Sequence, residues 1–116
     1  MNRGAAAEAL AAEFLQARGL TIVARNYRCR GGEIDLIASD GDTLIFVEVR
    51  LRSDAAFGGA AESITAAKKK RLTFAASHYL SRLSQMSREP PCRFDAILLG
   101  SLDPGRIEWL VDIDAN

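Results

Sequence analysis

Gly32-Glu33-Ile34-Asp35-Leu36-Ile37-Ala38, followed after a short polar break by Phe46-Val47-Glu48-Val49-Arg50, decides the fold of this chain. Both runs are rich in residue types that favour strands. Each run nevertheless carries an acid between apolar neighbours, Asp35 in the first and Glu48 in the second. Because a buried carboxylate without a partner is costly, these acids require compensation. A divalent metal ion, which binds carboxylate oxygens, is the leading candidate.

The two runs are expected to form a hairpin, because Asp40-Gly41 between them is a strong signal for a two-residue turn. This turn makes Asp35 and Glu48 diagonal neighbours on one face, roughly 7 to 8 Å apart at the backbone, with Arg50 on the same face. A three-residue turn would instead put the two acids on opposite faces. The expected register pairs Ser39 with Asp42, Asp35 with Phe46 and Glu33 with Glu48.

The rest of the chain predicts one mixed α/β domain over residues 1–116, of order αβββαββ. Ser63 is the expected cap of the second helix, and Pro90-Pro91 follows its end. The expected helices cover residues 4–18 and 63–83, and the expected strands cover 20–24, 33–39, 43–51, 93–99 and 106–113, with a loop at 53–60.

Glu8 in the first helix is a further candidate site residue. On a helical wheel it lies at the edge of the apolar arc that includes Ala7, Leu10 and Phe14, whereas Glu13 points away from that arc. Glu8 is therefore expected to face the sheet, while Glu13 is expected to face solvent.

These residues resemble a known family. An acid at the end of one strand, followed by Glu-x-Lys on the next, resembles the signature of the restriction-endonuclease-like nucleases. The chain looks like the YraN-like family of uncharacterised bacterial proteins, which is similar in turn to archaeal Holliday-junction resolvases. The resemblance extends from Gly4 to about Leu99. It is carried by the two acidic runs, by Arg25-Asn26-Tyr27 and by Arg93-Phe94-Asp95.

The resemblance implies a restriction-endonuclease-like fold and a metal-dependent endonuclease that acts on DNA, including branched or junction DNA. It implies that Asp35, Glu48 and the carbonyl of Val49 hold Mg²⁺ or Mn²⁺, and that Glu8 matches a glutamate of the N-terminal helix. The chain departs from the pattern at Arg50, where the family signature has lysine. Arginine stays protonated and cannot act as a general base, although it can bind a phosphate oxygen.

Lys68-Lys69-Lys70-Arg71 is the strongest basic run in the chain. Such a run is usually a solvated face. Lys68 differs from its neighbours because it shares the inward stripe of its helix with Leu72 and Ala76, so it is expected to face the carboxylate pair or a substrate phosphate and joins the catalytic candidates. The residues expected to contact a nucleic-acid backbone are Arg25, Arg28, Arg30, Arg52 and Lys69, with Tyr27 available for stacking.

Composition excludes several other classes of protein. The 116 residues are 48% hydrophobic with a net charge of zero, enough for one compact core, and no apolar run is long enough to span a membrane. Cys29 and Cys92 are too far apart for a zinc knuckle and are expected to be reduced cytoplasmic thiols. His78 is expected at the surface and Trp109 in the core, and the sequence lacks Ser-His-Asp and phosphate-loop motifs.

Three functions stay open at this point. The first is a Mg²⁺-dependent endonuclease that acts on DNA. The second is a nucleic-acid-binding domain with weak or no cleavage, motivated by Arg50. The third is a structural or adaptor protein in which Asp35 and Glu48 are salt-bridged to Arg50 and Lys68. A homodimer is among the assemblies that the sequence permits.

Overall fold

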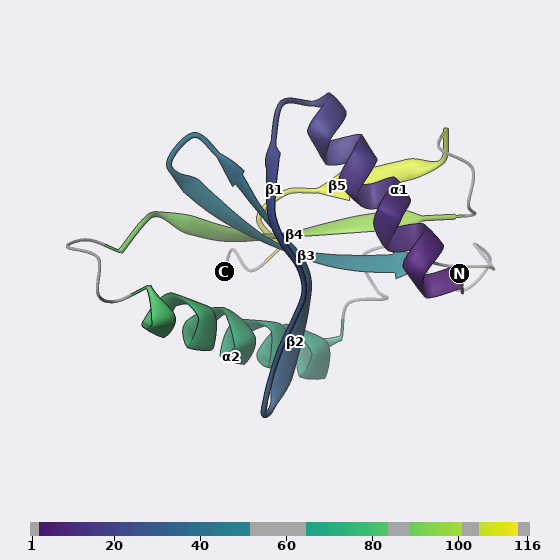
Figure 1. The fold of residues 1–116 in the computed structure, drawn as a ribbon. Helices are drawn as coiled ribbons and strands as arrows, with labels where there is room; N and C mark the ends of the chain where they lie inside the picture. The colour runs from purple at the N-terminus through teal and green to yellow at the C-terminus, as the bar shows by residue number, and fades with distance from the viewer. Residues whose placement is uncertain (1–2, 52–64, 84–88, 101–104, 114–116) are drawn as a thin grey trace.

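The computed structural model describes residues 3–51, 65–83, 89–100 and 105–113. Their elements follow the order that the sequence predicts, αβββαββ (Figure 1). The elements are α1 (Arg3–Ala17), β1 (Thr21–Cys29), β2 (Gly32–Asp40), β3 (Thr43–Leu51), α2 (Ala66–Arg82), β4 (Cys92–Leu99) and β5 (Ile107–Leu110).

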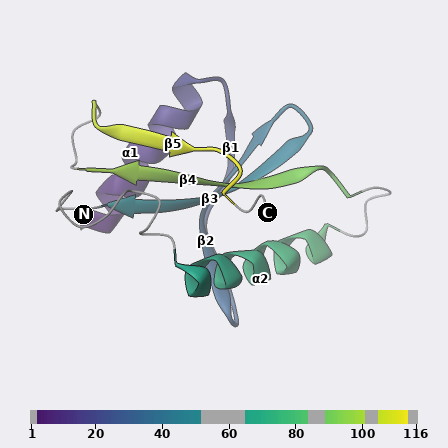
Figure 2. The same cartoon turned by 180° about the vertical axis from the view of Figure 1, so that it is seen from behind.

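The five strands form one open mixed sheet in the order β1-β2-β3-β4-β5. Neighbours are antiparallel except β3 and β4, which are parallel. A parallel pair needs a crossover, and α2 lies in the connection between β3 and β4. Seen from behind, β5 lies at the edge of the sheet opposite β1 (Figure 2).

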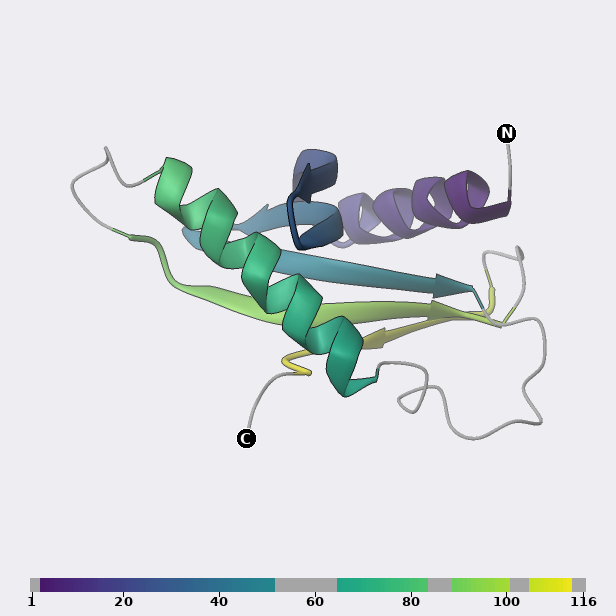
Figure 3. The same cartoon turned by 90° about the horizontal axis from the view of Figure 1, so that it is seen from below.

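The two helices cover different faces of the sheet (Figure 3). Ala7, Ala11 and Leu15 of α1 pack on a cluster that contains Val47 and Val49 of β3. Leu72, Ala75 and Ala76 of α2 pack on a second cluster that contains Phe46. Since side chains alternate along a strand, β3 is buried on both faces, and Glu48 and Arg50 lie on the face of Phe46, beneath α2.

The hairpin of β1 and β2 extends past the rest of the sheet as an arm. β2 pairs with β1 along its length but pairs with β3 only from Leu36 onward. In Figure 1 this arm crosses the direction of β3 and β4, and its tip lies beside α2. A Cβ on Gly32 would overlap the carbonyl oxygen of Arg71, so glycine is required for this close approach of strand and helix.

The predicted register of the second hairpin is wrong by two residues. Asp40 pairs with Thr43, so the turn is Gly41-Asp42 and not Asp40-Gly41. Gly41 has φ +61°, so it takes the first turn position, where a positive φ is needed. A shift of two residues leaves every side chain on its predicted face, so Asp35 and Glu48 still share a face. Phe46 is opposite Ile37 rather than Asp35, and Leu36 is opposite Val47.

Several predicted element boundaries also differ from the structure. β1 continues to Cys29 because the arm pairs it with β2, and β5 ends at Leu110. The cap of α2 is Thr65, whose side chain accepts a hydrogen bond from the Lys68 amide, rather than Ser63. Ser63, the 53–60 loop and Arg52 lie outside the described residues.

Candidate functional site

The candidate site lies where β2 separates from β3. Backbone pairing between the two strands ends at Leu36 and Val47, and Asp35 is the residue of β2 that precedes Leu36. Its Oδ2 accepts a hydrogen bond of 2.8 Å from the Val49 amide. The carboxylate therefore continues the hydrogen bonding between the strands beyond the last backbone pair, which fixes its position at this branch.

Asp35 and Glu48 come together at this branch. Burial raises the pKa of Asp35, the Glu48 carboxylate raises it further, and together they bring it to about 7 although the Val49 amide lowers it. The side chains of Asp35 and Glu48 are within hydrogen-bonding reach of each other. The two acids are thus half-buried neighbours whose negative charges repel, which is the arrangement that a cation relieves.

Glu8 approaches the same branch from α1. Burial raises the pKa of Glu8, and Asp35 raises it further, whereas a side-chain hydrogen bond with Asn26 lowers it. Glu8 and Asn26 line a pocket of about 370 Å³ together with Arg28 and the start of α1. The structure therefore brings Glu8 to the site, as its place on the helical wheel predicted.

Asn26 is a site residue that sequence reasoning missed. It has φ +54°, a left-handed conformation that Asn tolerates better than most residues. It lies on β1 between Arg25 and Tyr27, which pair with Leu36 and Ile34 of β2. Asp35 lies between those two partners, so Asn26 is across the strand pair from it. The run Arg-Asn-Tyr is visible in the sequence, but the hydrogen bond to Glu8 depends on the packing of α1.

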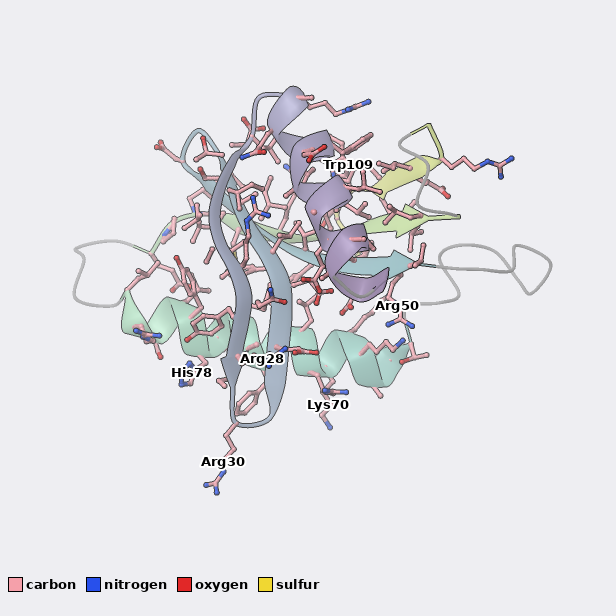
Figure 4. The ribbon with its side chains drawn as sticks, turned by 45° about the vertical axis from the view of Figure 1, so that its right-hand side comes forward. Arg28, Arg30, Arg50, Lys70, His78 and Trp109 are labelled. Atoms are coloured by element: carbon pink, nitrogen blue, oxygen red, sulfur yellow. The ribbon has the colours of Figure 1, made fainter. Side chains whose placement is uncertain are left out.

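Two cations face the acids from the α2 side. Burial lowers the pKa of Lys68, and Arg50 lowers it further, while Glu48 and Asp35 raise it. Arg50 follows Glu48 on the same face of β3 and its Nε is buried without a hydrogen-bond partner among the described residues. Figure 4 shows Arg50 near the end of β3 that lies beside the start of α2. Lys68 thus faces the carboxylate pair, as its place on the inward stripe predicted.

The atoms at the branch that could coordinate a metal ion are oxygens, which hard cations such as Mg²⁺ and Mn²⁺ prefer. Asp35 and Glu48 offer two carboxylates, and Val49 is positioned beside them by its bond to Asp35. No cluster of three or more His, Cys, Asp or Glu side chains with the geometry of a metal site occurs in the described ranges. The arrangement fits a site with two carboxylates and main-chain or water ligands better than a cage of side chains.

The other predicted basic contacts are spread over the arm and α2. Arg25 and Arg28 lie on β1, Arg30 lies at the turn of the arm, and all three are exposed. The Arg28 Nε is 3.3 Å from a Glu33 carboxylate oxygen, so part of its charge is already offset. Arg30 points away from the body of the protein in Figure 4. Lys69 is half-buried near the start of α2.

His78 and Trp109 lie as the sequence predicted. His78 is exposed, although its Nδ1 is 2.6 Å from the hydroxyl of Tyr27, a contact across 51 residues that sequence reasoning did not find. Trp109 packs on the α1 side of the core. Cys29 and Cys92 are free thiols. None of the helices in the described parts of the chain is both long and apolar enough to cross a membrane.

Comparison with known proteins identifies relatives of this chain. The sequence model of the uncharacterised protein family UPF0102 matches residues 7–99. A UPF0102 protein of Cupriavidus pinatubonensis is 59% identical over 110 residues, which cover 93% of this chain and 81% of the relative. A UPF0102 protein of Methylobacillus flagellatus is 56% identical over 106 residues, covering 91% of this chain and 90% of the relative.

A UPF0102 protein of Nitrosomonas eutropha is 55% identical over 109 residues, covering 94% of this chain and 90% of the relative. The expected membership of an uncharacterised bacterial family is therefore confirmed. Because the family model and these relatives each match most of its length, the chain belongs to the UPF0102 family.

Proposed function

We propose that this protein is a Mg²⁺-dependent endonuclease with a restriction-endonuclease-like fold that acts on DNA. The observation that carries the proposal is the branch between β2 and β3, where Asp35 and Glu48 share one half-buried space and Lys68 and Arg50 face them. Adjacent acids backed by cations are suited to phosphodiester hydrolysis, which needs both a metal ion and positive charge near the phosphate.

The chemistry divides between the metal and the side chains. Bound Mg²⁺ would lower the pKa of a water molecule and offset charge on the phosphate. Asp35 and Glu48 would hold the ion, and the Val49 amide keeps Asp35 in position through its hydrogen bond. Glu8, which is linked to Asn26 and lies next to Asp35, would orient water at the edge of the site.

Arg50 and Lys68 share the role that the family signature gives to one lysine. The Arg50 Nε is buried and has no hydrogen-bond partner among the described residues, and a guanidinium at this position can place positive charge near a phosphate. Lys68 is the better candidate for moving a proton, because burial and the neighbouring Arg50 both lower its pKa. Lys68 could therefore accept the proton of the attacking water, and cleavage would not need a lysine at position 50.

Two other functions compete with this one. A nucleic-acid-binding domain with little cleavage is favoured by the replacement of lysine with Arg50. An adaptor with salt-bridged acids has less support, because the ion pairs in the described parts of the chain are Arg28 with Glu33 and Arg93 with Asp95. Asp35 and Glu48 are absent from these pairs.

The deciding experiment is a cleavage assay with labelled duplex, single-stranded and four-way-junction DNA in Mg²⁺, Mn²⁺ or EDTA. We expect cleavage in either metal ion and none in EDTA. Glu48→Ala should remove it while leaving DNA affinity in EDTA unchanged, because affinity comes from the Lys and Arg contacts.

Glu13→Ala is the matched control, because Glu13 is an exposed acid on α1. Metal-independent binding without cleavage of any of the three substrates would support the binding domain instead. A protein that neither binds nor cleaves DNA would leave the adaptor as the better description.

A further inference from the structure

The outer face of α2 carries a stripe of exposed side chains that the candidate site does not use. Lys70, Phe74, His78 and Arg82 follow one another at intervals of four residues, so they lie along one side of the helix. The stripe is about 18 Å long at 1.5 Å per residue. Lys70 projects away from the sheet in Figure 4, whereas His78 contacts Tyr27 of β1.

The charges of α2 are unbalanced. The helix contains Lys68, Lys69, Lys70, Arg71 and Arg82 but no acid, and its first turn has no acidic residue. Cations near the start of a helix are unfavourable, because the N-terminal end of the helix dipole is positive. A sequence that places four cations there conflicts with local stability, and such conflicts are expected at functional surfaces. A surface with this excess of positive charge attracts polyanions such as a nucleic-acid backbone.

A groove runs along the same stripe. Its volume is about 720 Å³, and its described walls are Lys69, Lys70, Thr73, Phe74, Ser77 and His78. That volume lies within the range of pockets that bind small molecules, and it combines cationic, hydroxyl and aromatic groups.

Phe74 is the aromatic member of the groove and is held in place although 54% of it is exposed. A Cβ on Gly31 at the tip of the arm would lie 3.1 Å from the Phe74 ring. Gly31 also has φ +98°, a conformation that suits glycine. The arm therefore packs its backbone against one part of the ring and leaves the rest open to a ligand.

The far end of the stripe is fixed by Tyr27. Its hydroxyl is 2.6 Å from His78 Nδ1, and the Arg82 guanidinium lies 5.9 Å from the centre of the Tyr27 ring. Tyr27 itself belongs to β1, so the arm supports the stripe at both Phe74 and His78. This support keeps the aromatic and cationic groups in one line.

We propose that the outer stripe of α2 binds a single-stranded segment of the nucleic acid, with an unpaired base stacked on Phe74 and phosphates bound by Lys70 and Arg82. The inference rests on the proposed nuclease function and assigns its substrate class: DNA with an unpaired strand next to the site of cleavage. α2 connects the two regions, because Lys68 at its start faces Asp35 and Glu48.

A single strand fits this surface better than a duplex. Stacking on an aromatic side chain needs an open base face, which unpaired nucleotides expose and a continuous duplex does not. A duplex presents phosphates and the edges of its bases, but its base faces are stacked inside the helix, so an exposed phenylalanine has no base face to contact. The ring between Lys70 and His78 is therefore the feature that selects the single strand.

The test is fluorescence anisotropy in EDTA with a labelled twelve-nucleotide oligo-dT and a labelled blunt duplex of the same length. Phe74→Leu keeps an apolar side chain against Gly31 but cannot stack. We expect it to weaken oligo-dT binding by about 5- to 50-fold and to change duplex binding less than about twofold. Phe74→Tyr should retain the affinity, and equal melting temperatures would show that the variants are folded.

Charge contacts are tested by the salt dependence of binding. Lys70→Gln and Arg82→Gln should each reduce the slope of log K against log salt by about 0.7 for the single strand. Arg106→Gln is the matched control, because Arg106 is an exposed cation that precedes β5 at the opposite edge of the sheet. Its slope should equal that of the unmodified protein.

The outcomes separate this inference from the proposed function. Equal oligo-dT affinity for Phe74→Leu and the unmodified protein, or no oligo-dT binding at low salt, would overturn the stacking surface even if metal-dependent cleavage of duplex DNA is intact. Conversely, oligo-dT binding that depends on Phe74, without cleavage of any substrate, would retain the surface and refute the nuclease.

Discussion

Asp35 and Asp95 are two aspartates in strands of the same sheet, and the protein treats them differently. Asp95 on β4 is fully buried, with 0% of its surface exposed. Its carboxylate accepts hydrogen bonds from the Arg93 guanidinium, the Trp109 Nε1 at 2.9 Å and the Asp112 amide at 2.9 Å. Asp35 is less buried than Asp95. Its carboxylate accepts a hydrogen bond from the Val49 amide, and it lies next to Glu48 and Glu8.

The difference separates a structural acid from a candidate functional one. Around Asp95 the protein supplies a cation and enough donors for both oxygens, so the carboxylate links β4, β5 and the turn after β5. Around Asp35, burial and the neighbouring acids raise its pKa, and Lys68 faces the carboxylate pair without forming an ion pair with Asp35 among the described residues, so a bound cation would add compensating charge. Burial alone would have ranked Asp95 first as a site.

The cations next to these acids repeat the contrast. Arg93 binds Asp95 through both Nε and Nη2. Arg50 has its Nε buried without a partner in the described part of the chain. The Arg93 guanidinium is engaged and holds the fold together, whereas the Arg50 Nε keeps a donor that no described residue satisfies.

The largest expected effect is on cleavage. Asp35→Asn should lower the rate by about 10³-fold or more, because under the proposed function it removes a ligand of the metal ion and with it several kcal/mol of transition-state stabilisation. Asp95→Asn should leave the rate within about tenfold wherever the variant is folded. Initial rates on one labelled DNA substrate in Mg²⁺ would compare the two. Equal losses at both positions would break the distinction between them.

The second effect is on stability, and it is reversed between the two positions. Asp95→Ala leaves Arg93, Trp109 and the Asp112 amide without their acceptor, which should cost about 3 to 5 kcal/mol and lower the melting temperature by roughly 10 °C or more. Asp35→Asn should raise the melting temperature of the metal-free protein, because it removes a repelling charge. Thermal unfolding in EDTA measures both, and a stable Asp95→Ala would show that its network contributes little.

A smaller effect is expected from the cation beside the site. Arg50→Lys introduces the lysine of the restriction-endonuclease-like signature that the sequence resembles, and under the proposed function it should raise cleavage by up to about 10²-fold, since lysine can lose a proton near neutral pH. Lys68→Ala should lower cleavage in the unmodified protein and do so less in Arg50→Lys. An unchanged rate in Arg50→Lys, combined with a large loss in Lys68→Ala, would assign the proton transfer to Lys68 alone.

Sequence reasoning predicted the order of elements and the faces of Asp35, Glu48 and Lys68, because both depend on the local periodicity of strands and helices. It did not predict the register, because Asp40-Gly41 and Gly41-Asp42 are both plausible turns and only packing of the strands selects one. The side-chain bond between Tyr27 and His78 joins residues 51 apart, and no local pattern signals it. The arm had no signal beyond Gly31-Gly32, whose close approach to α2 is a tertiary feature.

The smallest expected effect is the pH dependence of stability, and its sign follows from Asp35. Its pKa in the folded protein is about 7, raised from 3.8, so the folded state binds the proton more tightly than the unfolded state. Between about pH 4 and pH 7 the unfolded state carries fewer protons, and stability therefore falls as the pH rises. We expect the melting temperature in EDTA to fall more steeply across this window in the unmodified protein than in Asp35→Asn, which has no carboxylate to ionise at this position. Above pH 7, millimolar Mg²⁺ should recover the loss by binding the ionised pair, and Asp35→Asn should show little gain. Parallel pH curves for the two proteins, with no response to Mg²⁺, would mean that Asp35 is compensated within the protein in the same way as Asp95.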